Sequence, residues 1–197
     1  MVERSVATID PSRFHRVNVA DTCAVWNILS SLLLYNVARD AGCQFCITDF
    51  VRYECLTKPR TSVSAADQEL MERLRRSERL GEIEHFSCEI DALEMISLLE
   101  SRRRLGKGEL SSIALAIKTH QAVITDDMKA RKLAKESGLS LTQTTAHLFS
   151  WLIFTRRLGD ADKTTIVSQH QDMGQHLAPH LEKAYELALQ CLLSVRP

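Results

Sequence analysis

Five acidic residues are spaced along this sequence so that they could bind a metal ion: Asp21, Glu54, Glu109, Asp126 and Asp127. Asp21 directly follows the apolar run Val17–Ala20, and Asp126 and Asp127 directly follow the run Ala122–Thr125. A set of carboxylates without histidine or cysteine selects hard ions such as Mg²⁺ or Mn²⁺. Because such ions activate water for attack on a phosphodiester, the chemistry that these residues could perform is phosphodiester hydrolysis.

The two glutamates of this set stand where an apolar residue is expected. Glu54 comes three and four residues after Val51 and Phe50, so it shares a helical face with them. Glu109 lies in the first turn of an otherwise apolar helix, after the flexible segment Gly106–Gly108. Both positions therefore need an explanation other than ordinary solvent exposure.

Each acid also has a simpler explanation when it is taken alone. Asp21 and Asp127 could be helix N-caps, and Glu109 could complement a helix dipole. Glu54 could pair with a neighbouring basic residue such as Arg52. Taken together, however, carboxylates crowded at one end of a sheet repel one another unless a cation neutralises them. The joint pattern therefore favours a metal site.

The elements that would bring these acids together alternate between short apolar runs and longer helical patterns. We expect strands at Val17–Ala20, Gln44–Ile47, Glu82–Phe86, Ala122–Thr125 and Leu139–Thr142. We expect helices at Ala24–Val37, Asp49–Leu56 (with Thr48 as N-cap), Ser64–Arg79, Glu89–Arg103, Gly108–Thr119, Asp127–Ser137, Thr144–Arg157, Lys163–His176 and Pro179–Ser194. Such alternation predicts a parallel sheet with helices on both faces, and such sheets bind ligands beyond the carboxyl ends of their strands.

Composition restricts the possible classes of protein. The chain has 197 residues, is 45% hydrophobic and carries no formal net charge, which predicts one well-packed domain without a broad basic surface. The N-terminus has no apolar core of a signal peptide, and the charge-free stretch Ser137–Thr155 is too polar to span a membrane. We therefore expect a cytoplasmic protein whose six cysteines are reduced, with a redox-active Cys43-x-x-Cys46 pair as the alternative to buried thiols.

Four segments carry a resemblance to a known family: VNVADTCAVWNIL, ITDFVRYECL, LGKGELSSIALA and AVITDDMKARKLAKESGL. In this order they resemble the PIN-domain nucleases, the family that includes the VapC-like toxins of toxin–antitoxin systems. The last two segments are the most specific, because a Gly-Glu opens an alanine-rich helix and a strand leads into Asp-Asp-x-x-Ala-Arg. The resemblance covers roughly residues 17–150. It implies an α/β fold with a PIN-like parallel sheet of about five strands flanked by helices.

The resemblance also implies an activity and a site. In this family the acids bind Mg²⁺ or Mn²⁺ and cleave RNA, which implies catalysis and metal binding by Asp21, Glu54, Glu109 and Asp127. The family pattern Thr-x-Asp would place Thr125 and Asp127 in the site and make Asp126 an auxiliary ligand. At the third position many members have aspartate, and Glu109 departs from that pattern. The implied partners are an RNA substrate and a cognate antitoxin protein.

The C-terminal part of the chain lies beyond the resemblance. We expect a PIN-like nuclease domain over residues 1–150 and a helical C-terminal extension over residues 151–197. The apolar stripe of this extension either completes the core of the chain or forms a surface for self-association or a partner, and we expect a homo-oligomer and no membrane association. Its three histidines form a solvated surface rather than a metal site: His170, His176 and His180.

Two other functions fit the same acids. A catalytically silent PIN module would hold RNA or a protein without cutting it, and a DNA or flap nuclease would use the same carboxylates on another sugar. Phosphate contacts could come from Lys107, from the run Arg102–Arg104, or from Arg156 and Arg157.

Overall fold

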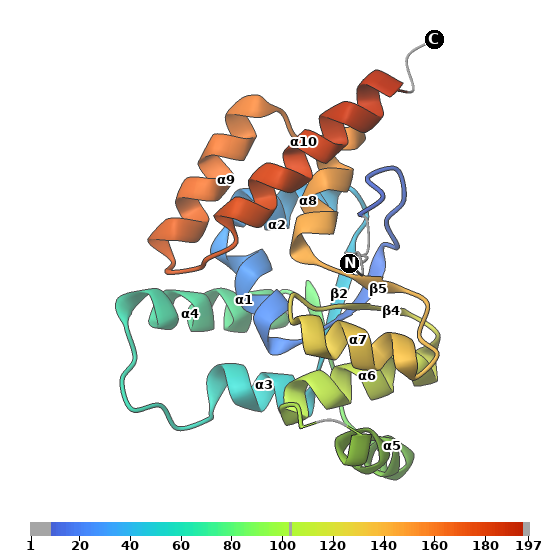
Figure 1. Cartoon of the computed structure of the whole chain (residues 1–197). Coiled ribbons are helices and arrows are strands. Elements are labelled where there is room, and N and C mark those ends of the chain that lie inside the picture. The colour runs from blue at the N-terminus through green and yellow to red at the C-terminus, as the bar shows by residue number, and fades with distance from the viewer. Residues whose placement is uncertain (1–8, 103, 195–197) are drawn as a thin grey trace, which may run out of the picture.

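The computed structural model describes residues 9–102 and 104–194 of the chain, and Figure 1 shows their arrangement. In chain order the elements are β1 (Val17–Ala20), α1 (Thr22–Ser30), α2 (Leu32–Asp40), β2 (Gln44–Thr48), α3 (Asp49–Leu56), α4 (Ala65–Arg79), β3 (Ile83–Phe86), α5 (Ile90–Arg102), α6 (Lys107–Thr119), β4 (Ala122–Ile124), α7 (Met128–Glu136), β5 (Thr142–Gln143), α8 (Thr145–Phe154), α9 (Asp160–Asp172) and α10 (Ala178–Ser194).

The strands form one five-stranded parallel sheet in the order β3-β2-β1-β4-β5. The chain starts at the central strand β1, moves outward to β2 and β3, and then returns to the other side of β1 with β4 and β5. The direction of winding therefore reverses between β1 and β4, which is where parallel α/β sheets bind their ligands. The predicted α/β fold is confirmed, and Asp21, Asp126 and Asp127 follow the two strands at this point.

Successive residues of the strands point into two apolar layers, one on each face of the sheet. In β1, Val19 packs with α5, α6 and α7, whereas the next residue, Ala20, packs with α1, α2 and α8. Cys46 and Ile47 of β2 divide between the two layers in the same way. The sheet is therefore covered on both faces, as the alternation of apolar runs and helical patterns predicts.

The bounds of most predicted elements shift by one to four residues, and two differences have a local cause. The single helix expected over Ala24–Val37 is divided at Ser31, whose extended backbone interrupts it and whose hydroxyl caps α2 by accepting a hydrogen bond from the Leu34 N–H (3.1 Å). The last strand was expected at Leu139–Thr142 but comprises Thr142 and Gln143 only. Gln143 belongs to it because its backbone pairs with Ile124 of β4, and its side chain donates to Asn18 of β1 (2.6 Å), contacts that the local sequence pattern cannot indicate.

The cysteines are free thiols, as the sequence predicts. Cys43 and Cys46 are both buried, but they pack into opposite apolar layers. Burial raises the pKa of each thiol to about 12, which removes the thiolate that a redox reaction needs. The redox interpretation of this pair is therefore not supported.

The C-terminal helices contribute to the same core as the helices next to β1. Leu181, Ala184 and Ala188 of α10 are fully buried in the apolar layer that also contains α1 and α2, whereas Leu189 and Leu193 near its end are exposed. Figure 1 shows α10 (red) lying across α8 and α9, with its last turns extending beyond them. The first part of the apolar stripe on α10 therefore completes the core of the chain, and its last apolar residues are exposed. Within the described ranges, no helix is both long enough and apolar enough to cross a membrane.

His170 corrects the prediction that the three C-terminal histidines form a solvated surface. Its side chain is fully buried, and its Nδ1 lies 2.6 Å from the hydroxyl of Ser30 on α1, whereas His176 and His180 are exposed. Burial lowers the pKa of His170 to about 4 from an ordinary value of 6.5. The native state therefore keeps this imidazole neutral where the unfolded chain would protonate it.

Acid should destabilise the fold through this one histidine. Because its native pKa is depressed, stability falls as the pH drops through 6.5 towards about 4, by about 2 kcal/mol between pH 7.5 and pH 5. In urea unfolding at these two pH values, His170→Gln should lose that much less stability on acidification than the wild type. The control His176→Gln should keep the pH dependence of the wild type. If His170→Gln keeps it as well, the acid sensitivity comes from other groups.

Candidate active site

Asp21 stands at the carboxyl end of β1 and has two functions at once. Its backbone N–H donates to the carbonyl of Ile124 in β4, and its Oδ1 caps α1 by accepting from the Ala24 N–H (2.8 Å). The side chain is only 1% exposed, and its Oδ2 makes no close hydrogen bond with the described residues, although the Thr125 hydroxyl is near enough to the carboxyl to lower its pKa. The simple role of a helix cap is therefore real, but it accounts for one oxygen only.

The environment of Asp21 disfavours its charge. Burial raises the pKa of this carboxyl to about 7, and the nearby carboxylates of Asp126 and Glu109 raise it further. A buried acid with an unpaired oxygen and acidic neighbours is costly to ionise. It becomes favourable when a cation occupies the space beside it.

Glu54 reaches from α3 towards α1 and α6. Its Oε2 accepts a hydrogen bond from the hydroxyl of Thr22 (2.5 Å), and its Oε1 accepts from the Gly108 N–H (3.2 Å). The ion pair considered from sequence is not formed, because Arg52 pairs instead with Glu78 (2.8 Å). Glu54 thus joins the start of α1 to the start of α6.

Glu109 lies in the first turn of α6, where its charge complements the helix dipole as the sequence indicates. Its Oε2 is buried without a hydrogen-bond partner in the described part of the chain. Burial raises the pKa of Glu109, and Glu54 and Asp127 raise it further. A Cβ built on Gly106 would stand 2.4 Å from Oε2 of Glu109 and 3.5 Å from Oε1 of Glu54. The missing side chain of Gly106 is what lets the two glutamates approach each other.

The two aspartates after β4 differ in their surroundings. Asp127 caps α7 by accepting from the Ala130 N–H (2.7 Å), and its own N–H donates to the Thr125 hydroxyl. Asp126 is turned towards α1 and α8. Its carboxylate accepts from the Asn27 amide (2.7 Å) and from both the N–H and the hydroxyl of Thr145 (3.0 and 2.7 Å). With both oxygens bonded, Asp126 holds three elements together, and its part in metal binding stays a prediction.

The acids named from the sequence therefore lie around one end of the sheet. Asp126 and Glu109 raise the pKa of Asp21, and Glu54 and Asp127 raise that of Glu109, so the five acids influence one another electrostatically, and their assignment to one metal site stays a prediction. No three histidine, cysteine, aspartate or glutamate side chains of the described residues are already arranged as a metal site. The donor set nevertheless fits a hard divalent ion, because it is made of carboxylates and leaves two buried oxygens without a donor.

Three polar residues around the acids were not among the sequence candidates. Thr22 donates to Glu54, and Thr48 bonds through its hydroxyl to Ser111 (2.6 Å), which in turn donates to the Gly108 carbonyl (2.9 Å). From the sequence, Thr48 is expected at the carboxyl end of its strand and as the N-cap of α3, and the structure confirms both. The one signal for Thr22 is its position directly after Asp21.

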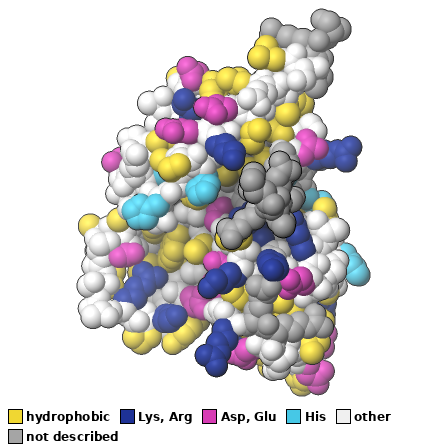
Figure 2. Space-filling view, viewed as in Figure 1, with side chains coloured by type: hydrophobic (Ala, Val, Ile, Leu, Met, Phe, Trp, Pro, Cys, Tyr) yellow, Lys and Arg dark blue, Asp and Glu magenta, His cyan; other side chains and the backbone are white. Residues whose placement is uncertain are grey.

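Two of the basic residues that were expected to contact phosphate are already bonded to other residues of the chain. Lys107 pairs with Glu100 (2.5 Å), and Arg157 donates to the Asp40 carbonyl at the end of α2. Arg104 is exposed, while Arg103 lies outside the described residues. On the face of the molecule that Figure 2 shows, acidic and basic side chains are intermixed and form no broad basic surface, in line with the zero net charge.

Comparison with known proteins gives one finding. Residues 21–181 match the family model described as DUF3368: PIN domain. The matched range begins at Asp21 and runs through α9 into α10, well beyond the roughly 17–150 covered by the motif resemblance. No curated protein matches the chain.

Proposed function

The chain belongs to the PIN-domain family, and we propose that it is an endoribonuclease that hydrolyses RNA phosphodiester bonds with Mg²⁺ or Mn²⁺. Nuclease activity is the general property of the family. The metal, the RNA substrate and a role as the toxin of a toxin–antitoxin pair are the parts that we propose. A cognate antitoxin and self-association stay predictions.

One observation supports this proposal most. Asp21 Oδ2 and Glu109 Oε2 are buried without a close donor, and burial raises the pKa of both acids despite nearby hydroxyl and backbone N–H groups that lower it. Leaving a buried acceptor unpaired costs about 1–3 kcal/mol, and a fold built only for stability avoids that cost twice in one place. A divalent cation would satisfy both oxygens and offset the repulsion between the acids.

We assign a different role in the proposed reaction to each group of residues. Asp21, Glu54, Glu109 and Asp127 would hold the ion, which when bound supplies a Lewis acid and lowers the pKa of an attacking water. Thr22 and the Gly108 N–H orient Glu54, so that this carboxylate points to Glu109 rather than to solvent. Thr125, held beside Asp127, could orient the phosphate or the water.

Incubation with end-labelled RNA and DNA, each with Mg²⁺, Mn²⁺ or EDTA, tests this proposal directly. We expect metal-dependent cleavage inside the RNA and none in EDTA. Cleavage of DNA or of a flap substrate alone would instead identify a DNA nuclease. Binding of RNA without cleavage under all conditions would identify a catalytically silent module.

Gly108→Ala should impair cleavage without unfolding the protein. The new Cβ would stand 2.4 Å from Glu54 Oε2 and 2.7 Å from Thr22 Oγ1, so the flexible Glu54 side chain must leave its position. Losing the support of one ligand typically costs about 10–100-fold in activity. Gly159→Ala is the matched control, because its Cβ would have only an ordinary contact, 3.8 Å from Asp162. Equal rates and melting temperatures in the two variants would show that the position of Glu54 does not matter.

A further inference from the structure

We propose that a groove on the far side of α3 from the acids binds the RNA strand beyond the scissile bond, through Arg52, Arg75 and Arg79. This inference rests on the proposed function. It assigns a substrate-binding site to a part of the molecule that contains none of the five candidate metal ligands.

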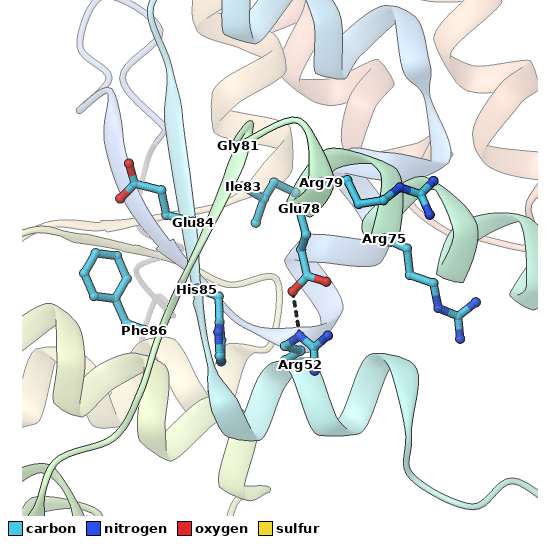
Figure 3. A pocket seen from close by; sticks show the side chains of 9 residues that line it. All are labelled: Arg52, Arg75, Glu78, Arg79, Gly81, Ile83, Glu84, His85 and Phe86. Carbon is cyan, nitrogen blue, oxygen red and sulfur yellow. Dashed lines mark hydrogen bonds and ion pairs between the residues drawn. The ribbon is translucent and has the colours of Figure 1, made fainter.

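The groove lies between the edge strand β3 and the helices α3 and α4, with a volume of about 750 Å³. Figure 3 shows Arg52 on α3 and Arg75 and Arg79 on α4, all on one side of β3, with Glu84 and Phe86 on the other side. Ile83 is the buried residue of β3 that lines it. Three arginines from two helices thus line one open groove.

The three arginines are available to a ligand. Their side chains are 44%, 45% and 66% exposed, in chain order. Arg52 pairs with Glu78, while Arg75 (3.9 Å) and Arg79 (2.8 Å) share Glu72 at the surface. The two pairs with Glu72 are exposed on both sides and contribute little in water, so a phosphate can displace them, whereas Glu78, whose side chain is 16% exposed, holds Arg52 beside the groove. The planar guanidinium fork matches phosphate oxygens in pairs.

The groove is one helix away from the acids. Arg52 and Glu54 are two residues apart on α3 and point in different directions, Arg52 into the groove and Glu54 to the Thr22 hydroxyl. A helix with its side chains is about 10–12 Å thick, a distance that a few nucleotides of an extended strand can cover. The groove also reaches the carboxyl end of β2. Phe86, which lines the groove, is paired in the sheet with Thr48, and the Thr48 hydroxyl is bonded to Ser111.

The groove also contains an aromatic ring beside the arginines. His85 lines the groove, and its Nε2 is bonded to Asp49, the first residue of α3. A carboxylate that fixes one edge of an imidazole leaves its face available, and unpaired RNA bases stack on such rings. Arginines for phosphates together with a ring for a base favour single-stranded RNA over an acidic protein, which would use the arginines alone.

Binding of a fluorescein-labelled 12-nucleotide single-stranded RNA, measured by anisotropy in EDTA over a range of salt, tests this assignment. The double variant Arg75→Ala/Arg79→Ala should bind about tenfold more weakly than the wild type. Each lost phosphate contact lowers the slope of log affinity against log salt by about 0.7, so the slope should fall by about 1.4. Arg76→Ala is the matched control, since Arg76 is exposed on the same helix but does not line the groove.

Cleavage kinetics separate this proposal from the proposed function. On the 12-nucleotide RNA the double variant should show a raised KM and an unchanged kcat, whereas on a trinucleotide, too short to reach the groove, both proteins should be equal. RNA cleavage with wild-type KM and salt slope in the double variant overturns the groove but keeps the nuclease. Arginine-dependent binding without any cleavage overturns the nuclease but keeps the groove. Binding of a polyglutamate peptide that is lost in the double variant, without any binding of RNA, would assign the groove to an acidic protein and overturn the proposal.

Discussion

Asp21→Asn and Glu109→Gln should each lower the rate of RNA cleavage by more than about 100-fold and leave the circular dichroism spectrum unchanged. Residues that only support a metal ligand cost about 10–100-fold when they are replaced, so the ligands themselves should cost more. Both substitutions keep the size of the side chain and one oxygen that accepts hydrogen bonds, and they remove the charge. Asn is a good N-cap, so the bond from the Ala24 N–H to position 21 is retained.

The measurement is initial cleavage rates in Mn²⁺ at saturating RNA, with Glu94→Gln as the control. Glu94 is an exposed acid on α5, so removing its charge should not change the rate. Activity that survives EDTA, or that persists in both Asp21→Asn and Glu109→Gln, would contradict the metal mechanism.

The position of these acids could be predicted because it depends on a general property of parallel sheets. All carboxyl ends meet at one edge, so an acid directly after an apolar run is placed near every other such acid. Asp21 and Asp127 follow β1 and β4, which are neighbours in the sheet. Both prove to be helix caps as well, so the simple and the functional explanations do not exclude each other.

Features that depend on contacts distant in sequence could not be predicted. Asp126 looks equivalent to Asp127 in the sequence, and only the approach of Asn27 and Thr145 shows that its carboxylate is already bonded. His170 looks like a surface residue of a polar helix until α9 packs on α1 and buries it against Ser30. Arg75 and Arg79 belong to α4, whose many charges indicate only a solvated helix when the sequence is considered alone.

The same buried carboxylate that should bind the ion should weaken the metal-free fold. The pKa of Asp21 is about 7 in the native state against 3.8 for the model compound, because of burial first and of acidic neighbours second. A raised native pKa means that the native state holds a proton which the unfolded chain has lost. Stability therefore falls as the pH rises from about 3.8 to about 7, by on the order of 4 kcal/mol, and the full cost is present above pH 7.

Neutralising this acid should consequently have opposite effects with and without metal. In EDTA at pH 8, Asp21→Asn should melt several degrees higher than the wild type, since it removes the cost of ionisation and each 1 kcal/mol shifts a chain of this size by about 2–4 °C. Added Mn²⁺ at about 100 times its dissociation constant should stabilise the wild type by about 2.7 kcal/mol, because the ion binds only the native site. The variant, which lacks one ligand, should gain clearly less. Thermal melts of both proteins in EDTA and in Mn²⁺ decide the matter. If Asp21 were a helix cap and nothing more, the variant would melt no higher in EDTA and Mn²⁺ would shift both proteins equally, and Asp21 would then be no ligand.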